Sequence, residues 1–102
     1  MHPLVFQTFE LKADNGTLEA GTILAYNTDG TAEAYDPTAA DGSPLLIPIG
    51  VLAYLTDTAR ATAGIAVVHG ILVKKALVVA GGTAPDDDDI TALRTALPVW
   101  VA

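Results

Sequence analysis

The side chains with the most reactive chemistry are few and scattered. The chain has one serine, Ser43, in a loop between Gly42 and Pro44, and two histidines, His2 and His69. A serine nucleophile needs a histidine base and a carboxylate that orients it, and no G-x-S-x-G turn surrounds Ser43. A triad of Ser43, His69 and an aspartate, or a carboxylate pair, remains a minor alternative. We therefore expect a protein that is not an enzyme and that uses no cofactor.

The sharpest local charge is the run of four aspartates, Asp86–Asp89. A calcium loop of the EF-hand type needs alternating ligands, a central glycine and a distal glutamate, and this run has none of that spacing. Acidic residues do complement the dipole of a helix N-terminus, and an aspartate is a good N-cap. The run favours the start of a helix over a weak divalent-cation site or a docking patch for a basic partner, and we expect no metal site.

Two other short motifs have structural explanations that require no special function. The pair Lys74-Lys75 could suggest a carrier domain with a modified lysine, but its neighbours are Val73 and Ala76. Paired lysines more often mark an exposed or edge strand, where they discourage unwanted pairing. The pair Gly81-Gly82 is followed by Thr-Ala-Pro rather than by Lys-Ser/Thr, so it is not a phosphate-binding loop.

Composition narrows the class of protein further. The 102 residues suit one domain, and with 51% hydrophobic but only 6% aromatic residues the core must be made of Val, Ile, Leu and Ala. A formal net charge of −7 disfavours binding to a phosphate backbone. There is no run of 18 apolar residues, no visible secretory signal and no cysteine, so we expect no membrane span, no leader and no disulfide.

The pattern of apolar and turn residues predicts a small, mainly β domain with six to eight short strands and one short C-terminal helix. The turn Asn27–Gly30 joins a hairpin, and the long Asp/Pro/Gly-rich segment 36–48 is a loop of a length that favours a functional or interface role. Ile90, Leu93 and Leu97 form a helical stripe that ends before Pro98. The predicted strands are 4–11, 22–26, 31–35, 49–55, 63–69, 71–73 with a bend at Gly70, 76–79 and 99–102.

The N-terminal segment is unusual for a chain end. Extended, it places Leu4 and Phe6 on one face and Val5, Phe9 and Leu11 on the other, so both faces are apolar. One interpretation is a first strand of the domain's own sheet. The other is an arm that adds a strand to another chain.

The order of the motifs resembles that of the lambda-type bacteriophage head decoration proteins, over about residues 20–102. Each motif is weak alone, and the specificity lies in their order and spacing. The matching pieces are Gly21-Thr22-Ile23-Leu24-Ala25, Asp29-Gly30, Tyr35-Asp36, Ile49-Gly50-Val51-Leu52-Ala53, Val68-His69-Gly70-Ile71-Leu72-Val73 and Leu93-Arg94-Thr95-Ala96. Family arms are often polar and rich in Thr, Ala and Pro, whereas residues 4–11 here are strand-like with two phenylalanines.

The resemblance implies a β-tulip fold, related to a small barrel or sandwich, and a structural role on the outer surface of the virion. It implies a homotrimer, made in the host cytoplasm, that binds the major capsid protein at three-fold positions of the expanded head and stabilises the shell against DNA pressure. It also implies a capsid-binding arm over residues 1–13, followed by the decoration domain 14–102. Combined with the apolar pattern of residues 4–11, it points to capsid contact through Leu4, Val5, Phe6, Phe9 and Leu11.

One alternative comes from the long loop. Its Asp, Pro and Gly residues could line a ligand site, which would suit a small secreted or tail-associated β domain that binds carbohydrate or another ligand through residues 36–48.

Overall fold

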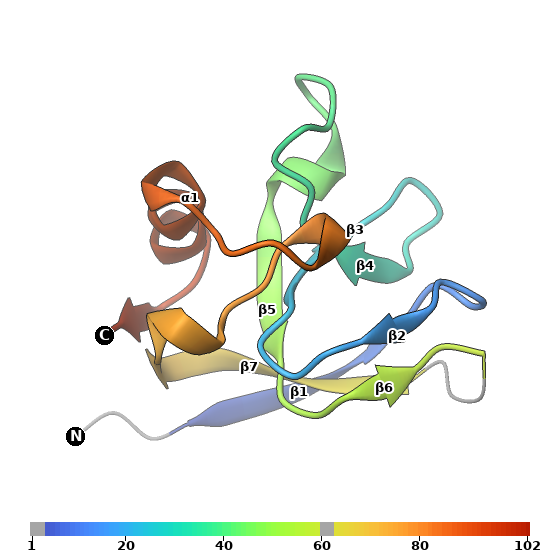
Figure 1. The fold of residues 1–102 in the computed structure, drawn as a ribbon, viewed down its shortest axis with the longest axis horizontal. Helices are drawn as coiled ribbons and strands as arrows, with labels where there is room; N and C mark the ends of the chain where they lie inside the picture. Colours follow the sequence, from blue (N-terminus) through green and yellow to red (C-terminus); the bar gives the residue numbers. More distant parts are fainter. Residues whose placement is uncertain (1–3, 60–62) are drawn as a thin grey trace.

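The computed structural model describes residues 4–59 and 63–102, and it shows the mainly β domain with one short C-terminal helix that the sequence predicts (Figure 1). The main sheet has the order β1-β7-β5-β3-β4, with β8 added in parallel to the end of β7. The main sheet is not closed into a barrel. A two-stranded ribbon, β2–β6, lies apart from it. The elements are β1 (Val5–Glu10), β2 (Thr17–Leu18), β3 (Ile23–Tyr26), β4 (Ala32–Ala34), η1 (Pro44–Leu46), β5 (Pro48–Leu52), β6 (Thr56–Asp57), β7 (Ala63–Leu72), η2 (Lys74–Ala76), η3 (Ala80–Gly82), α1 (Asp87–Ala96) and β8 (Val99–Val101).

The N-terminal segment is part of the main sheet. Strand β1 is its edge strand and pairs antiparallel with β7, from Val5 opposite His69 to Glu10 opposite Ala63, with a register shift between Val5 and Phe6. The first of the two interpretations of this segment therefore describes the fold. Whether the same strand also serves as a capsid-binding arm stays a prediction.

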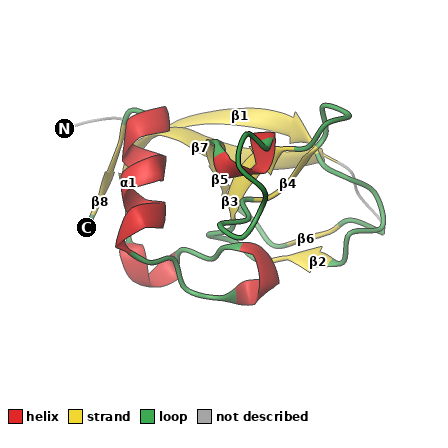
Figure 2. Cartoon of the chain, turned by 90° about the horizontal axis from the view of Figure 1, so that it is seen from above, coloured by secondary structure: helices red, strands yellow, loops and turns green. Residues whose placement is uncertain are grey.

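Two apolar clusters cover the two faces of the main sheet, because successive side chains of a strand point in opposite directions. The helix-side cluster lies against α1 and includes Ile23, Val51, Val67, Tyr35 and Leu93. The glycine-side cluster includes Phe9, Leu11, Leu24, Leu52 and Ala66. Figure 2 shows α1 beside β8 at one end of the molecule and the β2–β6 ribbon at the other.

The glycine-side cluster depends on small residues beneath β1. A Cβ at Gly64 would lie 2.9 Å from Leu11 Cδ1 and 3.0 Å from Leu52 Cδ1, and one at Gly50 would lie 3.2 Å from Phe9 Cε2. Phe9 and Leu11 fill this space and are only 5% and 1% exposed. Strand β1 is thus held by close packing of large side chains onto glycine.

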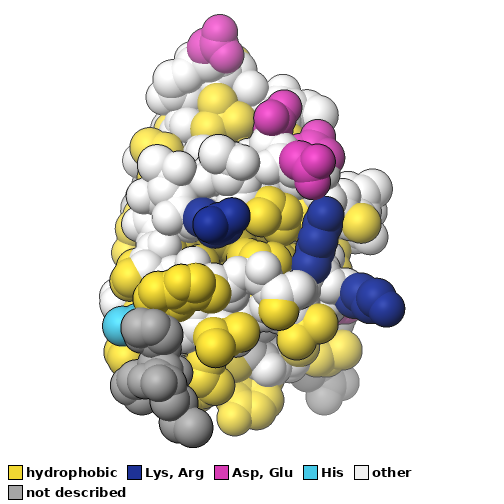
Figure 3. Space-filling model, turned by 90° about the vertical axis from the view of Figure 1, so that its left-hand side faces the viewer, with side chains coloured by type: hydrophobic (Ala, Val, Ile, Leu, Met, Phe, Trp, Pro, Cys, Tyr) yellow, Lys and Arg dark blue, Asp and Glu magenta, His cyan; other side chains and the backbone are white. Residues whose placement is uncertain are grey.

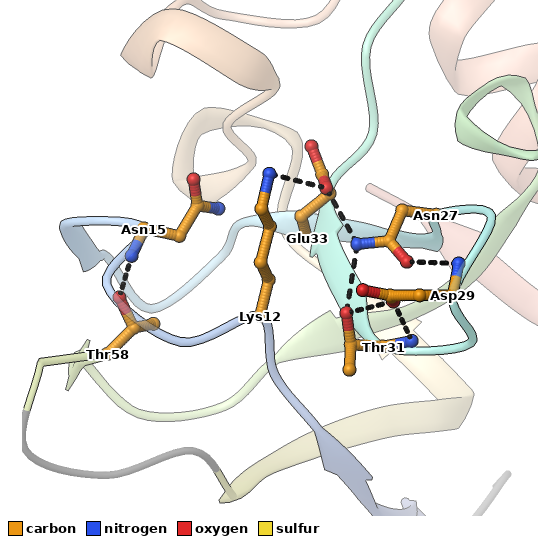
Figure 4. Close-up of polar contacts among 7 residues, drawn as sticks. All are labelled: Lys12, Asn15, Asn27, Asp29, Thr31, Glu33 and Thr58. Atoms are coloured by element: carbon orange, nitrogen blue, oxygen red, sulfur yellow. Dashed lines mark hydrogen bonds and ion pairs between the residues drawn. The ribbon is translucent and has the colours of Figure 1, made fainter.

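The predicted hairpin at Asn27–Gly30 is present, and its turn is closed by side chains (Figure 4). Asn27 Oδ1 accepts from the Asp29 amide (3.0 Å), and Asp29 Oδ1 accepts from the amide and hydroxyl of Thr31 (2.9 and 2.7 Å). These bonds from Thr31 lower the pKa of Asp29. Lys12, which follows β1, ties this hairpin to the N-terminal segment through an ion pair with Glu33 (3.8 Å) and a backbone bond to Ala32.

Three details differ from the prediction. The predicted strands 63–69 and 71–73 merge into one strand, β7, which ends at Leu72, and Gly70 lies within it at a φ of 138°. The predicted strand 76–79 is wrong: its first residue belongs to η2, and Val78 makes only an isolated bridge to Thr22. Val78 bonds to Gly21 and Ile23 at the start of β3, and from Leu24 onward β3 pairs with β4 and β5. The short strands β2 and β6 arise in segments that are not among the predicted strands.

Candidate functional site

The residues assigned to capsid contact divide into two groups. Leu4, Val5 and Phe6 are exposed, with Phe6 at 49%, whereas Phe9 and Leu11 are buried in the glycine-side cluster. The division follows the packing beneath the strand: the Phe9 ring lies against Gly50, whereas Phe6 lies opposite Val67, near the register shift. The first half of β1 therefore offers an apolar surface, and the second half anchors the strand.

Strand β1 also offers an open edge. In the described part of the chain it pairs with β7 alone, so the backbone groups on its other side are free to meet a partner. Its six residues, Val5–Glu10, contain neither proline nor lysine, and Glu10 is the only charged residue. Native proteins commonly protect such edges with charge, proline or a bulge. An edge strand whose only charged residue is its last one is the kind of element to which another chain can add a strand.

A second exposed apolar group lies next to the start of β1, at the end of β7 and on β8. Its members are Ile71, Val73 and Trp100, with Trp100 at 43% exposure and opposite Ile71 in the parallel pairing of β7 and β8. The sequence analysis did not assign a function to these residues. The sequence carries no signal for them, since residues 71–73 read Ile-Leu-Val without alternation, and only the structure shows Leu72 buried between two exposed neighbours.

Basic side chains surround this second group. Lys74 and Lys75 follow β7 in η2, and Arg94 lies on α1. They are three of the five Lys and Arg residues of the chain, whereas the segments 58–85 and 90–102 contain no Asp or Glu. Figure 3 shows this side of the molecule, where dark-blue basic groups lie among yellow hydrophobic side chains and the acidic groups gather toward one end.

A groove of about 510 Å³ runs between α1 and β8. It is open to solvent and combines a guanidinium, an indole and two hydroxyl groups. Its lining is Thr91, Arg94, Thr95, Leu97, Pro98, Val99 and Trp100. Among the described residues Arg94 has no carboxylate partner within ion-pair distance, whereas Lys74 pairs with Asp87 at 3.3 Å.

The aspartate run begins the helix, as predicted. Asp86 is the N-cap: its side chain accepts from the Asp89 amide (2.9 Å), and the Asp89 carboxylate accepts from the Asp86 amide (3.0 Å). Asp89 is buried and also accepts from the Tyr35 hydroxyl (3.2 Å). Burial, together with the negative charge of Asp89, raises the pKa of Tyr35 to about 12. Within residues 4–59 and 63–102, no group of three or more His, Asp or Glu side chains is placed to hold a metal ion.

The long loop uses its polar groups locally. Asp36 accepts from the hydroxyl and amide of Thr38 (2.6 and 2.9 Å), bonds that lower the pKa of Asp36. Ser43, the candidate nucleophile, caps η1 by accepting from the Leu45 amide (3.2 Å).

The candidate base, His69, lies on β7 and not in this loop, and its ring is 6.1 Å from that of Trp100. His2 lies outside the described residues.

A second groove, of about 340 Å³, lies where the end of the long loop meets α1. It is lined by Leu46, Ile47, Pro48, Ala92, Thr95 and Ala96, and so by apolar groups and a single hydroxyl. Carbohydrate sites in proteins require several converging polar groups, since sugar hydroxyls must be paired. This groove does not supply them.

The fold is that of a small β domain with exposed apolar side chains beside an open strand edge. The sequence profile of the bacteriophage lambda head decoration protein D family matches residues 6–97. The chain therefore belongs to this family of phage capsid decoration proteins, which confirms the resemblance drawn from the motif order. No curated protein has a significant sequence match to the chain. Within the described residues no helix is long and apolar enough to span a membrane.

Proposed function

We propose that this protein binds the expanded icosahedral phage head from outside, as trimers at the three-fold positions, and stabilises the shell against the pressure of packaged DNA. Its direct partner in this proposal is the major capsid protein. The observation that supports it most is the first half of β1, which combines exposed apolar side chains with an open strand edge in a member of the head decoration family.

The roles within the N-terminal segment follow from burial. Leu4, Val5 and Phe6 are proposed to contact the capsid directly, and a capsid strand added to the edge of β1 would supply backbone hydrogen bonds without a pocket. Phe9 and Leu11 act indirectly in this proposal, because they hold β1 in the sheet from the glycine-side cluster.

Stabilisation of the head needs no chemistry. A protein that binds the expanded shell and not its disrupted form stabilises the expanded shell by mass action. Burying one large apolar side chain contributes roughly 1.5–3 kcal/mol, so a modest contact repeated over many copies would strengthen the whole shell.

The test is to bind the purified protein to expanded, undecorated heads and to measure bound copies per capsid by sedimentation and cryo-microscopy. The proposal predicts saturation in a multiple of three, with density at three-fold positions. Phe6→Asp should weaken binding strongly, whereas Thr28→Asp, an equal charge change on the exposed β3–β4 turn, should not. Absence of binding by the unmodified protein would overturn the proposal, and equal effects of the two variants would remove the role of β1.

A further inference from the structure

The exposed start of β1 runs without a break into the apolar group at the end of β7. The Leu4 side chain occupies the space beside Gly70, where a Cβ would lie 2.4 Å from Leu4 Cδ2. Val5 is the register partner of His69, and the His69 ring lies 6.1 Å from the ring of Trp100. Figures 1 and 2 place the start of β1, the end of β7 and β8 at the same end of the molecule.

We call the group formed by Ile71, Val73, Trp100, Lys75 and Arg94 the β8 surface. Its three apolar members are all exposed, and Arg94 and Trp100 together line the groove between α1 and β8. A guanidinium binds a carboxylate through paired hydrogen bonds, while an aromatic ring beside it can cover the apolar part of the same segment. The groove therefore suits a chain segment that carries both acidic and apolar side chains.

The charge of the β8 surface narrows the kinds of partner that can bind there. The chain as a whole has a net charge of −7, yet the β8 surface is basic, with Asp87 as the acid that pairs with Lys74 at its border. A basic patch on an acidic protein selects an acidic partner and repels basic ones. Another copy of the protein also carries acidic groups, so contact between copies is one outcome of the experiment.

We propose that the β8 surface is a second capsid contact, which receives an acidic, partly apolar segment of the major capsid protein. In this arrangement Arg94 pairs with a carboxylate in the groove, and Trp100 and Ile71 pack on neighbouring apolar side chains. The inference rests on the proposed function, and the occupant is assigned to the capsid because the β8 surface continues the proposed capsid-contacting end of β1.

The experiment measures affinity for expanded, undecorated heads at low and high salt, using the full chain. Arg94→Glu is compared with Lys12→Glu, since Lys12 lies beyond the other end of β1, beside Glu33, and both variants change the net charge from −7 to −9. We expect Arg94→Glu to weaken binding by about tenfold at low salt, with a smaller loss at high salt, and Lys12→Glu to leave it within about twofold. Ile71→Ser should also weaken binding, and circular dichroism should show all three variants folded.

The outcomes separate the inference from the proposed function. If the unmodified protein binds heads while Arg94→Glu and Lys12→Glu bind equally well or equally poorly, the β8 surface is not a contact and the proposed function stands. If Arg94→Glu changes the oligomeric state in solution without heads, the surface lies between copies and the inference is overturned. If the unmodified protein does not bind heads at all, both fail together.

Discussion

The two faces of the main sheet are covered by different kinds of packing. On the glycine-side face, Phe9 and Leu11 pack onto Gly50 and Gly64 within a cluster of apolar side chains. On the helix-side face, α1 lies over the sheet, and a buried pair, Tyr35 and Asp89, links the sheet to the first turn of the helix. The stability of the glycine-side face therefore depends on how closely its side chains fit, whereas that of the helix-side face depends partly on the buried hydrogen bond between Tyr35 and Asp89.

The largest effect should come from the glycine-side face. Phe9→Ala removes the ring that fills the space above Gly50, so the free energy of unfolding should fall by about 3–5 kcal/mol, measured by chemical denaturation. Phe6→Ala, on the same strand but half exposed, should change it by less than about 0.5 kcal/mol. Equal losses for the two variants would mean that β1 does not pack as described.

The burial of Phe9 and Leu11 also bears on how much of the site could be predicted from sequence. The apolar pattern of residues 4–11 correctly indicates a strand, but a pattern with large groups on both faces cannot say which ones meet a core. That depends on Gly50 and Gly64, which lie far away in the sequence. An arm over residues 1–13 that is separable from the domain was expected, whereas deletion of residues 1–11 should now cost much of the stability of the fold.

Other features were predictable for local reasons. The helix and its aspartate cap follow from a capping residue, a stripe of apolar residues and a proline stop, all within a few positions. The β8 surface was not predictable, because Ile71 and Trp100 meet only through the parallel pairing of β8 with β7, and Arg94 joins Trp100 from α1 across the groove. Strands β2 and β6 were missed since two-residue strands leave no periodicity.

The second largest effect tests the close packing itself. Gly64→Ala adds a methyl group within 2.9 Å of Leu11 Cδ1, and overpacking of this kind costs about 1–3 kcal/mol. Part of this is offset by about 0.4–1 kcal/mol, because alanine reduces the freedom of the unfolded chain. We expect a net loss of about 1–2 kcal/mol in thermal or chemical unfolding.

A double mutant at the same site provides the control. If crowding against Leu11 is the cause, the effect of Gly64→Ala should shrink when it is combined with Leu11→Ala, since the added methyl group then has room. Strictly additive losses in the double mutant would show that the two positions do not compete for space.

The stability that the helix-side face contributes should depend on pH in the alkaline range, whereas that of the glycine-side face should not. The pKa of Tyr35 is raised to about 12 by burial and by Asp89, above about 10 for an unfolded chain. Its contribution to stability is therefore complete below pH of about 10 and is lost as the pH rises toward 12, because the unfolded chain releases the proton first. Unfolding measured between these pH values should show a steeper decline for the natural sequence than for Tyr35→Phe.

At neutral pH the same variant isolates the hydrogen bond. Tyr35→Phe removes one of the donors to the buried Asp89 carboxylate, while the Asp86 amide still donates to it. We expect a loss of about 1 kcal/mol. A stability curve for Tyr35→Phe that follows the natural sequence through the alkaline range would argue against a role of this pair.

The smallest effect concerns the ion pair between Lys12 and Glu33, which ties the N-terminal segment to the β3–β4 hairpin. Lys12 and Glu33 are 3.8 Å apart, and the lysine side chain is half exposed, so solvent screens the attraction. Lys12→Met should lower the free energy of unfolding by less than about 0.5 kcal/mol, because Leu11 and the backbone bond from Lys12 to Ala32 remain. A loss as large as that of Phe9→Ala would mean that charge, and not the fit of side chains onto glycine, holds this face of the sheet together.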